Sequence, residues 1–214
     1  MLRARGEHLE ALLWRRARPP HENRWSLPGG RLRGDEDVET SIRRQLAEKV
    51  DVHKLSHVEQ LSVFSDPARV PDRRVVATAF LGLVPSDVDP EVPGDTAWHP
   101  LEDLPATAFD HERIAVAARD RLRAKLSYSN LGFALAPAEF TISELRRIYS
   151  AALGYRVSAT NLQRVLTRRG VLEPTGRTMP AGPSGGRPPA LFRFTQPGLE
   201  ITDQFAVLRP PERA

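Results

Sequence analysis

Residues 30–52 read GRLRGDEDVETSIRRQLAEKVDV, and this stretch decides how the first half of the chain is interpreted. It begins at the end of a Pro-Gly-Gly turn, which lets the backbone approach a neighbouring group closely. Apolar residues recur at every fourth position from Val38 to Val50, a spacing that predicts an amphipathic helix. Acidic residues around Gly34 and Asp35 favour a helix start there, because they complement the positive end of the helix dipole.

The residues around this helix resemble the Nudix box, whose usual form is G-x5-E-x7-R-E-U-x-E-E-x-G-U, with U an aliphatic residue. The chain keeps the positions Gly30, Glu36, Arg44, Leu46, Glu48 and Val52. It departs from the box at Gln45, Lys49 and Asp51. An ordinary amphipathic helix is the alternative, but the turn and the matched positions occur together and favour the box.

Two of these departures affect the chemistry of a Nudix hydrolase. Hydrolysis of a diphosphate needs Mg²⁺ or Mn²⁺ to neutralise charge and activate water, and these ions take carboxylate ligands. Positions 45, 48 and 49 share one helix face, where three acids would form the ligand cluster. Here the face carries Gln45, Glu48 and Lys49, so one carboxylate remains. We predict that Lys49 meets the diphosphate directly and that the box has no catalytic residue and no metal ligand.

Glu36 and Arg44 allow two interpretations. An ion pair between them would hold the loop on the helix, which we favour, whereas a role in ligand binding stays open. With Arg44 included, the box residues predicted to contact a ligand are Arg44, Gln45, Glu48 and Lys49.

The composition excludes several classes of protein. Hydrophobic residues make up 40% and charged residues 27% of the 214 residues, which is ordinary for a globular protein in water. No stretch approaches the roughly 18 consecutive apolar residues of a membrane span, and the basic N-terminal segment lacks the apolar run of a signal peptide. The chain has no cysteine, which excludes disulfides and cysteine-ligated zinc, so we expect a cytoplasmic protein.

Strand-like runs surround the box helix. We expect strands at 9–14, 58–64 and 75–84, and a long closing helix that begins near Asp110. Strands interrupted by one helix and closed by another predict an α/β domain with a mixed sheet flanked by helices.

The pattern changes after residue 140. Two short helices are expected at 141–153 and 158–170, the first starting at a Thr141 cap and the second running from a Ser158 cap to a Gly170 cap. Two strands, VLEPT and ALFRFT, follow on either side of a basic Gly/Pro loop. Helix, helix, strand, loop and strand is the order of a winged helix-turn-helix.

Basic charge is concentrated in this second part. Residues 1–126 carry 20 Lys/Arg and 21 Asp/Glu, whereas residues 141–194 carry 9 Arg and 2 Glu. Such a local field attracts a polyanion such as DNA, although arginine-rich faces are also often plain solvated surface. The second helix would reach base edges, and the loop between the strands would grip a groove or the backbone. The residues nominated for DNA contact are Ser158, Thr160, Asn161, Gln163, Arg164, Arg168, Arg177 and Arg187.

Further segments extend the resemblance from about residue 9 to residue 195: HVEQLSVFSDPARVPDRRVVATAFLGLV, TAWHPLEDLPATAFDH, FTISELRRIY and GGRPPALFRF. Together they look like the Nudix-related transcriptional regulators of NAD metabolism, the NrtR family, with actinobacterial members most similar. The resemblance implies a dimeric repressor of NAD biosynthesis or salvage genes that binds a palindromic operator. It also implies release from DNA by ADP-ribose and no required cofactor. The implied organisation is a Nudix-like sensing domain at 1–126, a junction at 127–140 and a winged helix-turn-helix domain at 141–214.

Several residues outside the box are candidates for contact with that effector. The loop SDPARVPDRR offers arginines to the diphosphate or ribose, namely Arg69, Arg73 and Arg74, although loop arginines are also often solvated. Trp25 either stacks on adenine or packs beside the Pro-Gly-Gly turn. Asp110 is expected to cap the closing helix, and His111 is a weak metal or base candidate.

Two other functions stay open at this point. The chain could be a Nudix hydrolase of ADP-ribose or a related nucleoside diphosphate with an accessory winged helix, which Gln45 and Lys49 disfavour. The winged helix could instead bind a protein partner, which the basic charge of residues 141–194 disfavours.

Overall fold

The computed structural model describes residues 1–50, 55–71, 73–180 and 188–203, apart from the side chains of Lys49 and Val50. The chain divides into two compact units. Unit 1 comprises Met1–Arg3, His8–Val84 and Val88–Arg121, and unit 2 comprises Ala4–Glu7, Pro85–Asp87 and Leu122–Ala214. The domain boundaries expected at residues 126 and 140 stay a prediction.

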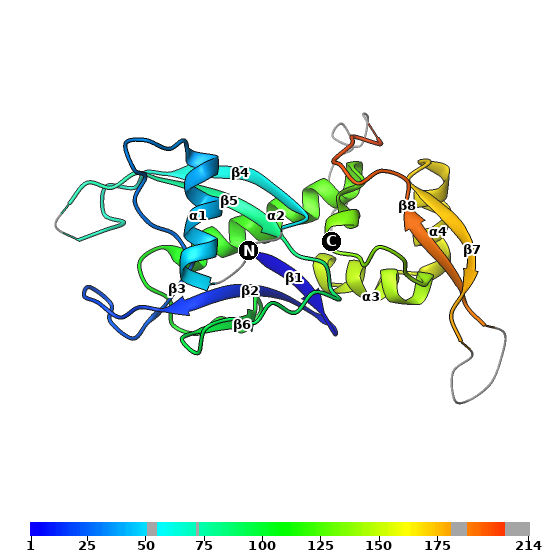
Figure 1. Cartoon of the computed structure of the whole chain (residues 1–214), viewed down its shortest axis with the longest axis horizontal. Coiled ribbons are helices and arrows are strands. Elements are labelled where there is room, and N and C mark those ends of the chain that lie inside the picture. The colour runs from blue at the N-terminus through cyan, green and yellow to red at the C-terminus, as the bar shows by residue number, and fades with distance from the viewer. Residues whose placement is uncertain (51–54, 72, 181–187, 204–214) are drawn as a thin grey trace. The chain divides into compact units, whose positions relative to one another are not determined.

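Unit 1 holds a mixed sheet, to which the described residues contribute six strands (Figure 1), except that Ala4 and Arg5 at the end of β1 are grouped with unit 2. The strands are β1 (Leu2–Arg5), β2 (His8–Arg15), β3 (Trp25–Ser26), β4 (His57–Phe64), β5 (Ala77–Leu83) and β6 (Thr96–Pro100). Their order is β3-β2-β1-β5-β4, and β6 also pairs with β2. β1 runs parallel to β5, whereas β2 is antiparallel to β3 and β6, and β4 is antiparallel to β5. The predicted mixed sheet is confirmed.

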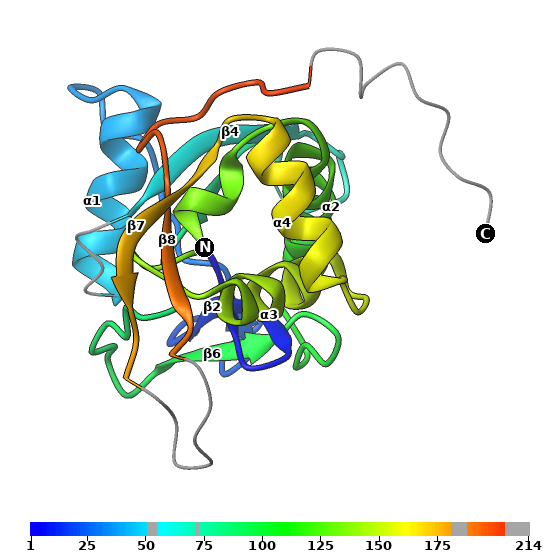
Figure 2. The ribbon, with the colours of Figure 1, turned by 90° about the vertical axis from the view of Figure 1, so that its right-hand side faces the viewer.

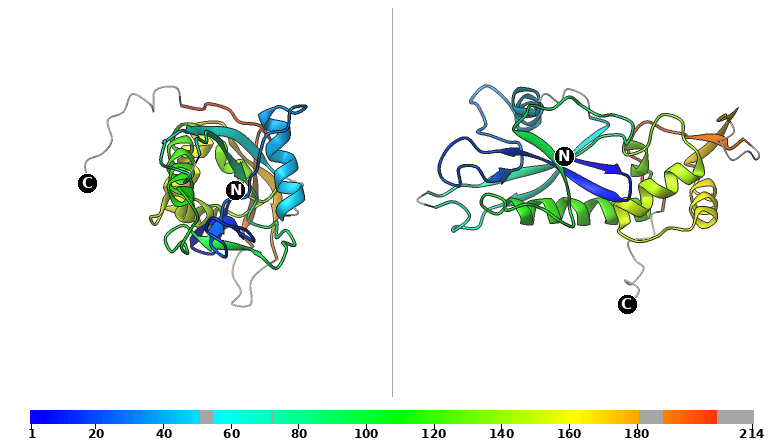
Figure 3. Two further views of the ribbon diagram at one scale, coloured as in Figure 1. Left: turned by 90° about the vertical axis from the view of Figure 1, so that its left-hand side faces the viewer. Right: turned by 90° about the horizontal axis from the view of Figure 1, so that it is seen from below.

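Two helices, α1 (Val38–Val50) and α2 (His111–Tyr128), lie on opposite faces of this sheet (Figures 1 and 3). The box helix α1 packs through Leu46, which is 5% exposed and contacts Leu12 of β2, with Ile42 beside it. Val38 is 40% exposed, so the apolar stripe of α1 covers the sheet only beyond its first turn. The helix expected near Asp110 is α2, which starts one residue later.

The sequence prediction missed β1, because it began the sheet at residue 9, and it assigned no strand to the short β3 and β6. β1 lies between β2 and β5, in the middle of the sheet. Its Arg3 reads as a surface residue but is 6% exposed. The guanidinium donates to Glu10 at 2.8 Å and to Asp89 at 2.7 Å, and it lies 4.1 Å from the ring centre of Trp98. A buried arginine with these partners has no signature in local periodicity.

The start of α1 also differs from the prediction at Gly34 and Asp35. The helix begins at Val38, because Asp37 precedes it and accepts the Thr40 N–H on its carboxylate at 2.7 Å. An aspartate in this position satisfies one of the backbone donors that the first helical turn leaves unpaired.

Unit 2 contains the winged helix-turn-helix elements in the expected order (Figure 2). They are η1 (Leu131–Ala134), α3 (Ile142–Leu153), α4 (Ala159–Arg168), β7 (Leu172–Thr178) and β8 (Ala190–Phe194). α3 packs against α4, and β7 is antiparallel to β8. The core contains Leu145 and Ile148 of α3 and Leu162 and Leu166 of α4. Among the described helices of both units, none combines the length and the apolar character needed to cross a membrane.

Capping residues set the ends of the two unit 2 helices. The hydroxyls of Thr141 and Ser158 each accept the N–H three residues further on, at 3.1 and 3.4 Å, which confirms both predicted N-caps. α3 ends at Gly154, whose φ of 79° is left-handed. α4 has its C-cap at Arg169, and Gly170 with φ of 69° follows, so the predicted cap at Gly170 is one residue late.

Candidate functional site

Arg44 of α1 holds the loop that precedes the helix. Its Nε and Nη2 donate to the two carboxylate oxygens of Glu36 at 2.7 and 2.6 Å, and Glu36 also accepts the Arg33 N–H at 2.9 Å. The hydrogen bond from Arg44 is the main cause that lowers the pKa of Glu36 to about 2. The bidentate geometry confirms the predicted ion pair between Glu36 and Arg44.

Glu48, the remaining acid of the predicted metal face, is also bound by arginines. One carboxylate oxygen accepts from Arg33 Nη2 at 3.3 Å and the other from Arg44 Nη1 at 3.0 Å. A divalent cation needs several oxygen ligands, yet the described residues contain no group of three or more Asp, Glu or His side chains that could hold one. The described residues of the box therefore offer no ligand set for the metal of a Nudix hydrolase.

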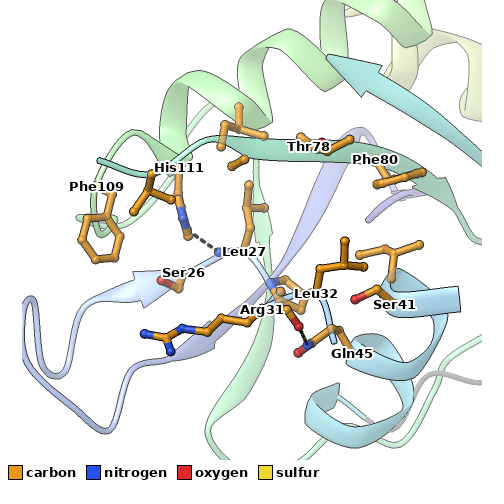
Figure 4. Close-up of a pocket in the computed structure, with 18 of the residues that line it drawn as sticks. Ser26, Leu27, Arg31, Leu32, Ser41, Gln45, Thr78, Phe80, Phe109 and His111 are labelled. Carbon is orange, nitrogen blue, oxygen red and sulfur yellow. Dashed lines mark hydrogen bonds between the residues drawn. The ribbon is translucent and has the colours of Figure 1, made fainter. Parts of the chain in front are cut away.

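Gln45 stands where the usual box has a glutamate. Its side chain is 5% exposed and lies against Gly30, where a Cβ atom would overlap the Gln45 amide. In Figure 4 the amide nitrogen donates to the Arg31 carbonyl, at 3.4 Å. Turned over, the amide presents its oxygen to Nη1 and Nη2 of Arg44, at 3.1 Å each. The second orientation is favoured, because both of its hydrogen bonds are charge-assisted.

A cavity of about 1350 Å³ opens beside the box, within unit 1. Its walls come from β3 and the loop after it, from α1, from β5 and from the start of α2 (Figure 4). Much of the wall is apolar, including Ile42, Val58 and Phe80. The wall contains no acidic side chain among the described residues, and its arginines are Arg16, Arg18, Arg31, Arg69, Arg73 and Arg74. Apolar and cationic walls suit a ligand that joins an anionic group to an apolar ring.

The cavity brings together four of the residues predicted to contact a ligand: Gln45, Arg69, Arg73 and Arg74. Arg44, Glu48 and Trp25 are not part of its described wall, and the side chain of Lys49 lies outside the described residues. The Arg15 guanidinium lies 5.0 Å from the ring centre of Trp25, and the ring of His99 lies 4.4 Å from it. The loop arginines and the box helix thus share one cavity.

Arg69 and Asp110 form a buried ion pair at the edge of this cavity. Nε and Nη2 of Arg69 donate to the carboxylate at 3.0 and 2.7 Å, and the two side chains are 5% and 15% exposed. Asp110 precedes α2 as expected, but its carboxylate binds Arg69, and Thr107 accepts the Glu112 N–H at 3.2 Å instead. Arg69 therefore anchors the loop before β5 to the start of α2.

His111 joins the start of α2 to the segment before the box. Its Nδ1 accepts the Leu27 N–H at 2.9 Å (Figure 4). Burial lowers the pKa of His111 to about 4, so the imidazole is neutral at neutral pH. Beside it, Phe109 has a φ of 54°, and the Arg16 guanidinium lies 4.9 Å from its ring centre.

The sequence analysis missed three cavity arginines, Arg16, Arg18 and Arg31. Arg31 directly follows the Pro-Gly-Gly turn, and Arg16 and Arg18 follow β2. The signal that could have identified Arg31 is its position beside the turn through which the backbone approaches a ligand.

In unit 2, one face of α4 forms a shallow groove. The groove residues are Thr160, Gln163, Arg164, Thr167 and Arg168. Steps of three and four residues place them on one side of the helix, away from the buried Leu162 and Leu166. The predicted set did not include Thr167, which the same spacing places on this side of the helix. Asn161 lies next to this face and accepts from Arg164 Nη2 at 2.7 Å.

The other nominated DNA residues have distinct environments. Ser158 uses its hydroxyl to cap α4. Arg177 of β7 is 71% exposed and donates to both carboxylate oxygens of Glu139, at 3.1 and 3.0 Å. Arg187 lies outside the described residues. Arg177 thus forms an exposed surface ion pair, a kind that contributes little to stability.

Comparisons with known proteins agree with this two-part organisation. Residues 1–119 match the NUDIX domain family, and residues 132–194 match the NrtR DNA-binding winged helix domain. A protein of Acinetobacter baylyi named ADPR responsive transcriptional repressor NtrR is 30% identical over 196 residues, which span 87% of this chain and 76% of that protein.

Solved structures give the same picture. Shewanella oneidensis NrtR, crystallised with a 27mer DNA, is similar with a TM-score of 0.76 and 29% identity over 92% of this chain and 90% of that chain. The NUDIX domain of the same protein, crystallised with ADP ribose, has a TM-score of 0.50 and 30% identity over 56% of this chain and 84% of that chain. The chain therefore belongs to the NrtR family of Nudix-related transcriptional regulators.

Proposed function

We propose that this protein is a transcriptional repressor that ADP-ribose releases from its operator. The single observation that carries the proposal is the arginine-lined cavity beside a box whose matched glutamates, Glu36 and Glu48, are bound by Arg33 and Arg44. Such a site attracts a diphosphate and offers no ligand set for the metal that hydrolysis requires. The similar structures with ADP ribose and with DNA support both halves of the proposal.

The cavity suits the two chemical parts of ADP-ribose. Exposed guanidiniums, among them Arg31 and Arg73, can hold the diphosphate through charge-assisted hydrogen bonds. Apolar wall residues can cover the adenine. Lys49 remains a proposed diphosphate contact, and Gln45 shapes the wall against Gly30.

The protein acts as a sensor without hydrolysing its ligand in this proposal. Gln45 cannot bind a divalent cation as a carboxylate does, and the charge of Glu48 is already balanced by arginines. An enzyme would need these groups to rearrange around the metal.

On the DNA side, we propose that two copies of the chain bind a palindromic operator through the exposed face of α4. The regulated genes would be those of NAD biosynthesis or salvage. The protein would act in the cytoplasm. Half-sites are spaced by helical turns of DNA, so a change in the spacing of the two α4 helices would release the protein. Crystals with and without ADP-ribose that have the same distance between the two Asn161 residues would contradict this release mechanism.

Titration calorimetry with ADP-ribose, with and without Mg²⁺, tests the sensor. The same samples are then separated by chromatography to detect AMP and ribose phosphate. We expect binding that is insensitive to the metal and no products. Metal-dependent formation of AMP would instead establish the hydrolase.

A gain-of-function variant tests why the box is inactive. Replacing Gln45→Glu and Lys49→Glu together restores the acids of the usual box, and Mn²⁺ binding can then be measured by calorimetry. Mn²⁺ binding by the double variant and not by the wild type would show that Gln45 and Lys49 are the reason the wild-type box binds no metal. A double variant that binds no Mn²⁺ would show that the arginines on Glu48 and Glu36 also exclude it.

A further inference from the structure

Ser26 is a polar residue of the cavity wall that the fold leaves without a hydrogen-bond partner. The residue is 1% exposed, and its Oγ has no partner among the described residues. A buried hydroxyl without a partner costs stability, so such groups are rare in folded proteins. β3 places Ser26 opposite Trp14 of β2, at the cavity wall.

His111 borders the same part of the cavity. The N–H of Leu27, the residue after Ser26, donates to His111 Nδ1 at 2.9 Å, and both residues line the wall (Figure 4). Because Nδ1 is the acceptor, a neutral ring carries its proton on Nε2. No described residue accepts that proton. Ser26 Oγ and His111 Nε2 are therefore two uncharged groups with unused hydrogen-bonding capacity.

The surroundings favour an uncharged ligand group at this place. The charge of Arg69 is balanced by Asp110 in a buried pair. The Arg16 guanidinium keeps its charge, but its Nε and Nη2 donate to the carbonyls of Pro20 and Arg18, at 3.1 and 3.4 Å. Neutral donors and acceptors of this kind match sugar hydroxyls, which both donate and accept.

We propose that Ser26 and His111 form a subsite for the hydroxyl groups of the terminal ribose, which is the part of ADP-ribose that ADP lacks. This inference rests on the proposed function and makes the subsite the source of selectivity for ADP-ribose over ADP. A site that hydrogen-bonds a hydroxyl discriminates against ligands without it, because its own polar groups then stay unpaired.

The test compares the affinities of ADP-ribose and ADP by calorimetry for the wild type, Ser26→Ala and His111→Asn. Asparagine keeps an oxygen that can accept the Leu27 N–H but removes the Nε2 donor. Loss of one neutral hydrogen bond should weaken ADP-ribose binding about two- to tenfold in each variant. ADP binding should stay unchanged.

Thr96→Val is the matched control. Thr96 pairs with Trp14 from the other edge of β2, is 6% exposed, and lies outside the described cavity wall. We expect this variant to bind both nucleotides like the wild type, which shows that removal of a buried hydroxyl from this sheet does not by itself disturb the cavity.

Each remaining outcome overturns the inference. Equal weakening of ADP and ADP-ribose would assign the two residues to the phosphates or the adenosine. Unchanged ADP-ribose binding in folded variants would make their role purely structural. A wild-type protein that binds no ADP-ribose would overturn the proposed function together with the subsite. The other two outcomes would overturn the subsite alone.

Discussion

At the scale of single residues, the two matched glutamates of the box take part in ion pairs with arginines. Arg44 bonds to both Glu36 and Glu48, and Arg33 adds a second guanidinium on Glu48. The neutral Gln45 then occupies buried space beside Arg44 that a third carboxylate would have charged. In the described part of the box, guanidiniums thus balance the charge of both glutamates.

The Glu36 pair should stabilise unit 1 in a pH-dependent manner. Its carboxyl pKa falls from 4.5 to about 2 on folding, so the stabilisation is present above pH 4.5 and is lost as the pH falls to about 2. We expect Glu36→Gln to lower the urea midpoint at pH 7 and to flatten its decline between these pH values. Parallel urea midpoint curves for the variant and the wild type would contradict this.

His111 should cause a second loss of folding stability as the pH falls. Its pKa is 6.5 when unfolded and about 4 when folded, so the unfolded chain binds the proton first and stability falls between these values. The difference corresponds to about 3 kcal/mol at most. We expect His111→Asn to remove this decline in chemical denaturation measured from pH 7 to pH 4. A variant that declines as steeply as the wild type would assign the step to another group.

At the scale of elements, α4 separates its stabilising residues from the exposed residues that we propose to contact DNA. Ser158 caps its start, Leu162 and Leu166 bury one side, and the groove residues occupy the other. At its end, Arg169 donates to the Ser127 carbonyl at 2.7 Å and to Asp203 at 3.2 Å. Adjacent arginines at the end of α4 thus have different roles, since Arg168 lines the groove.

Two alanine variants should show this separation. We expect Arg164→Ala to weaken operator binding by about 1–3 kcal/mol and to leave thermal unfolding unchanged. Arg169→Ala should instead destabilise unit 2 by roughly 1–3 kcal/mol, because it removes the charge-assisted hydrogen bonds to the Ser127 carbonyl and to the largely buried Asp203 carboxylate. Fluorescence anisotropy with operator DNA and calorimetric melting measure the two effects. A large loss of stability in Arg164→Ala would refute the assignment.

At the scale of the whole molecule, function requires that the two units influence each other. Residues 111–128 form one helix, whose first part belongs to unit 1 and whose last part belongs to unit 2. In unit 2, Arg123 of this helix donates to the Ala152 carbonyl near the end of α3 at 3.1 Å. A continuous helix with contacts in both units is a candidate for coupling the cavity to the DNA-binding face.

Thermodynamic linkage makes this coupling measurable. If ADP-ribose weakens operator binding by a given factor, the operator must weaken ADP-ribose binding by the same factor, typically about 5- to 150-fold. We expect calorimetric titration of ADP-ribose into free protein and into the operator complex to give that ratio. Equal affinities in the two titrations would show that ADP-ribose does not release the protein from DNA.

The sequence predicted much of this protein, because the relevant signals are local. Helical periodicity identified α1, α3 and α4, side chains within three residues supplied the caps at Thr141 and Ser158, and the box spacing led to the Glu36–Arg44 pair. The basic excess of residues 141–194 and the order of their elements identified the winged helix in the same way.

Tertiary structure decided what depends on residues far apart in the chain. Arg3 can lie in the central strand β1 because Asp89, far along the chain, accepts a hydrogen bond from it. Asp110 likewise binds Arg69, which lies 41 residues earlier in the chain. The cavity likewise combines residues from Met1 to Ile114, so its arginines and the unpartnered Ser26 could not be grouped in advance. Local patterns report the backbone and its immediate neighbours, whereas a binding site is a set of side chains that only the folded sheet brings together.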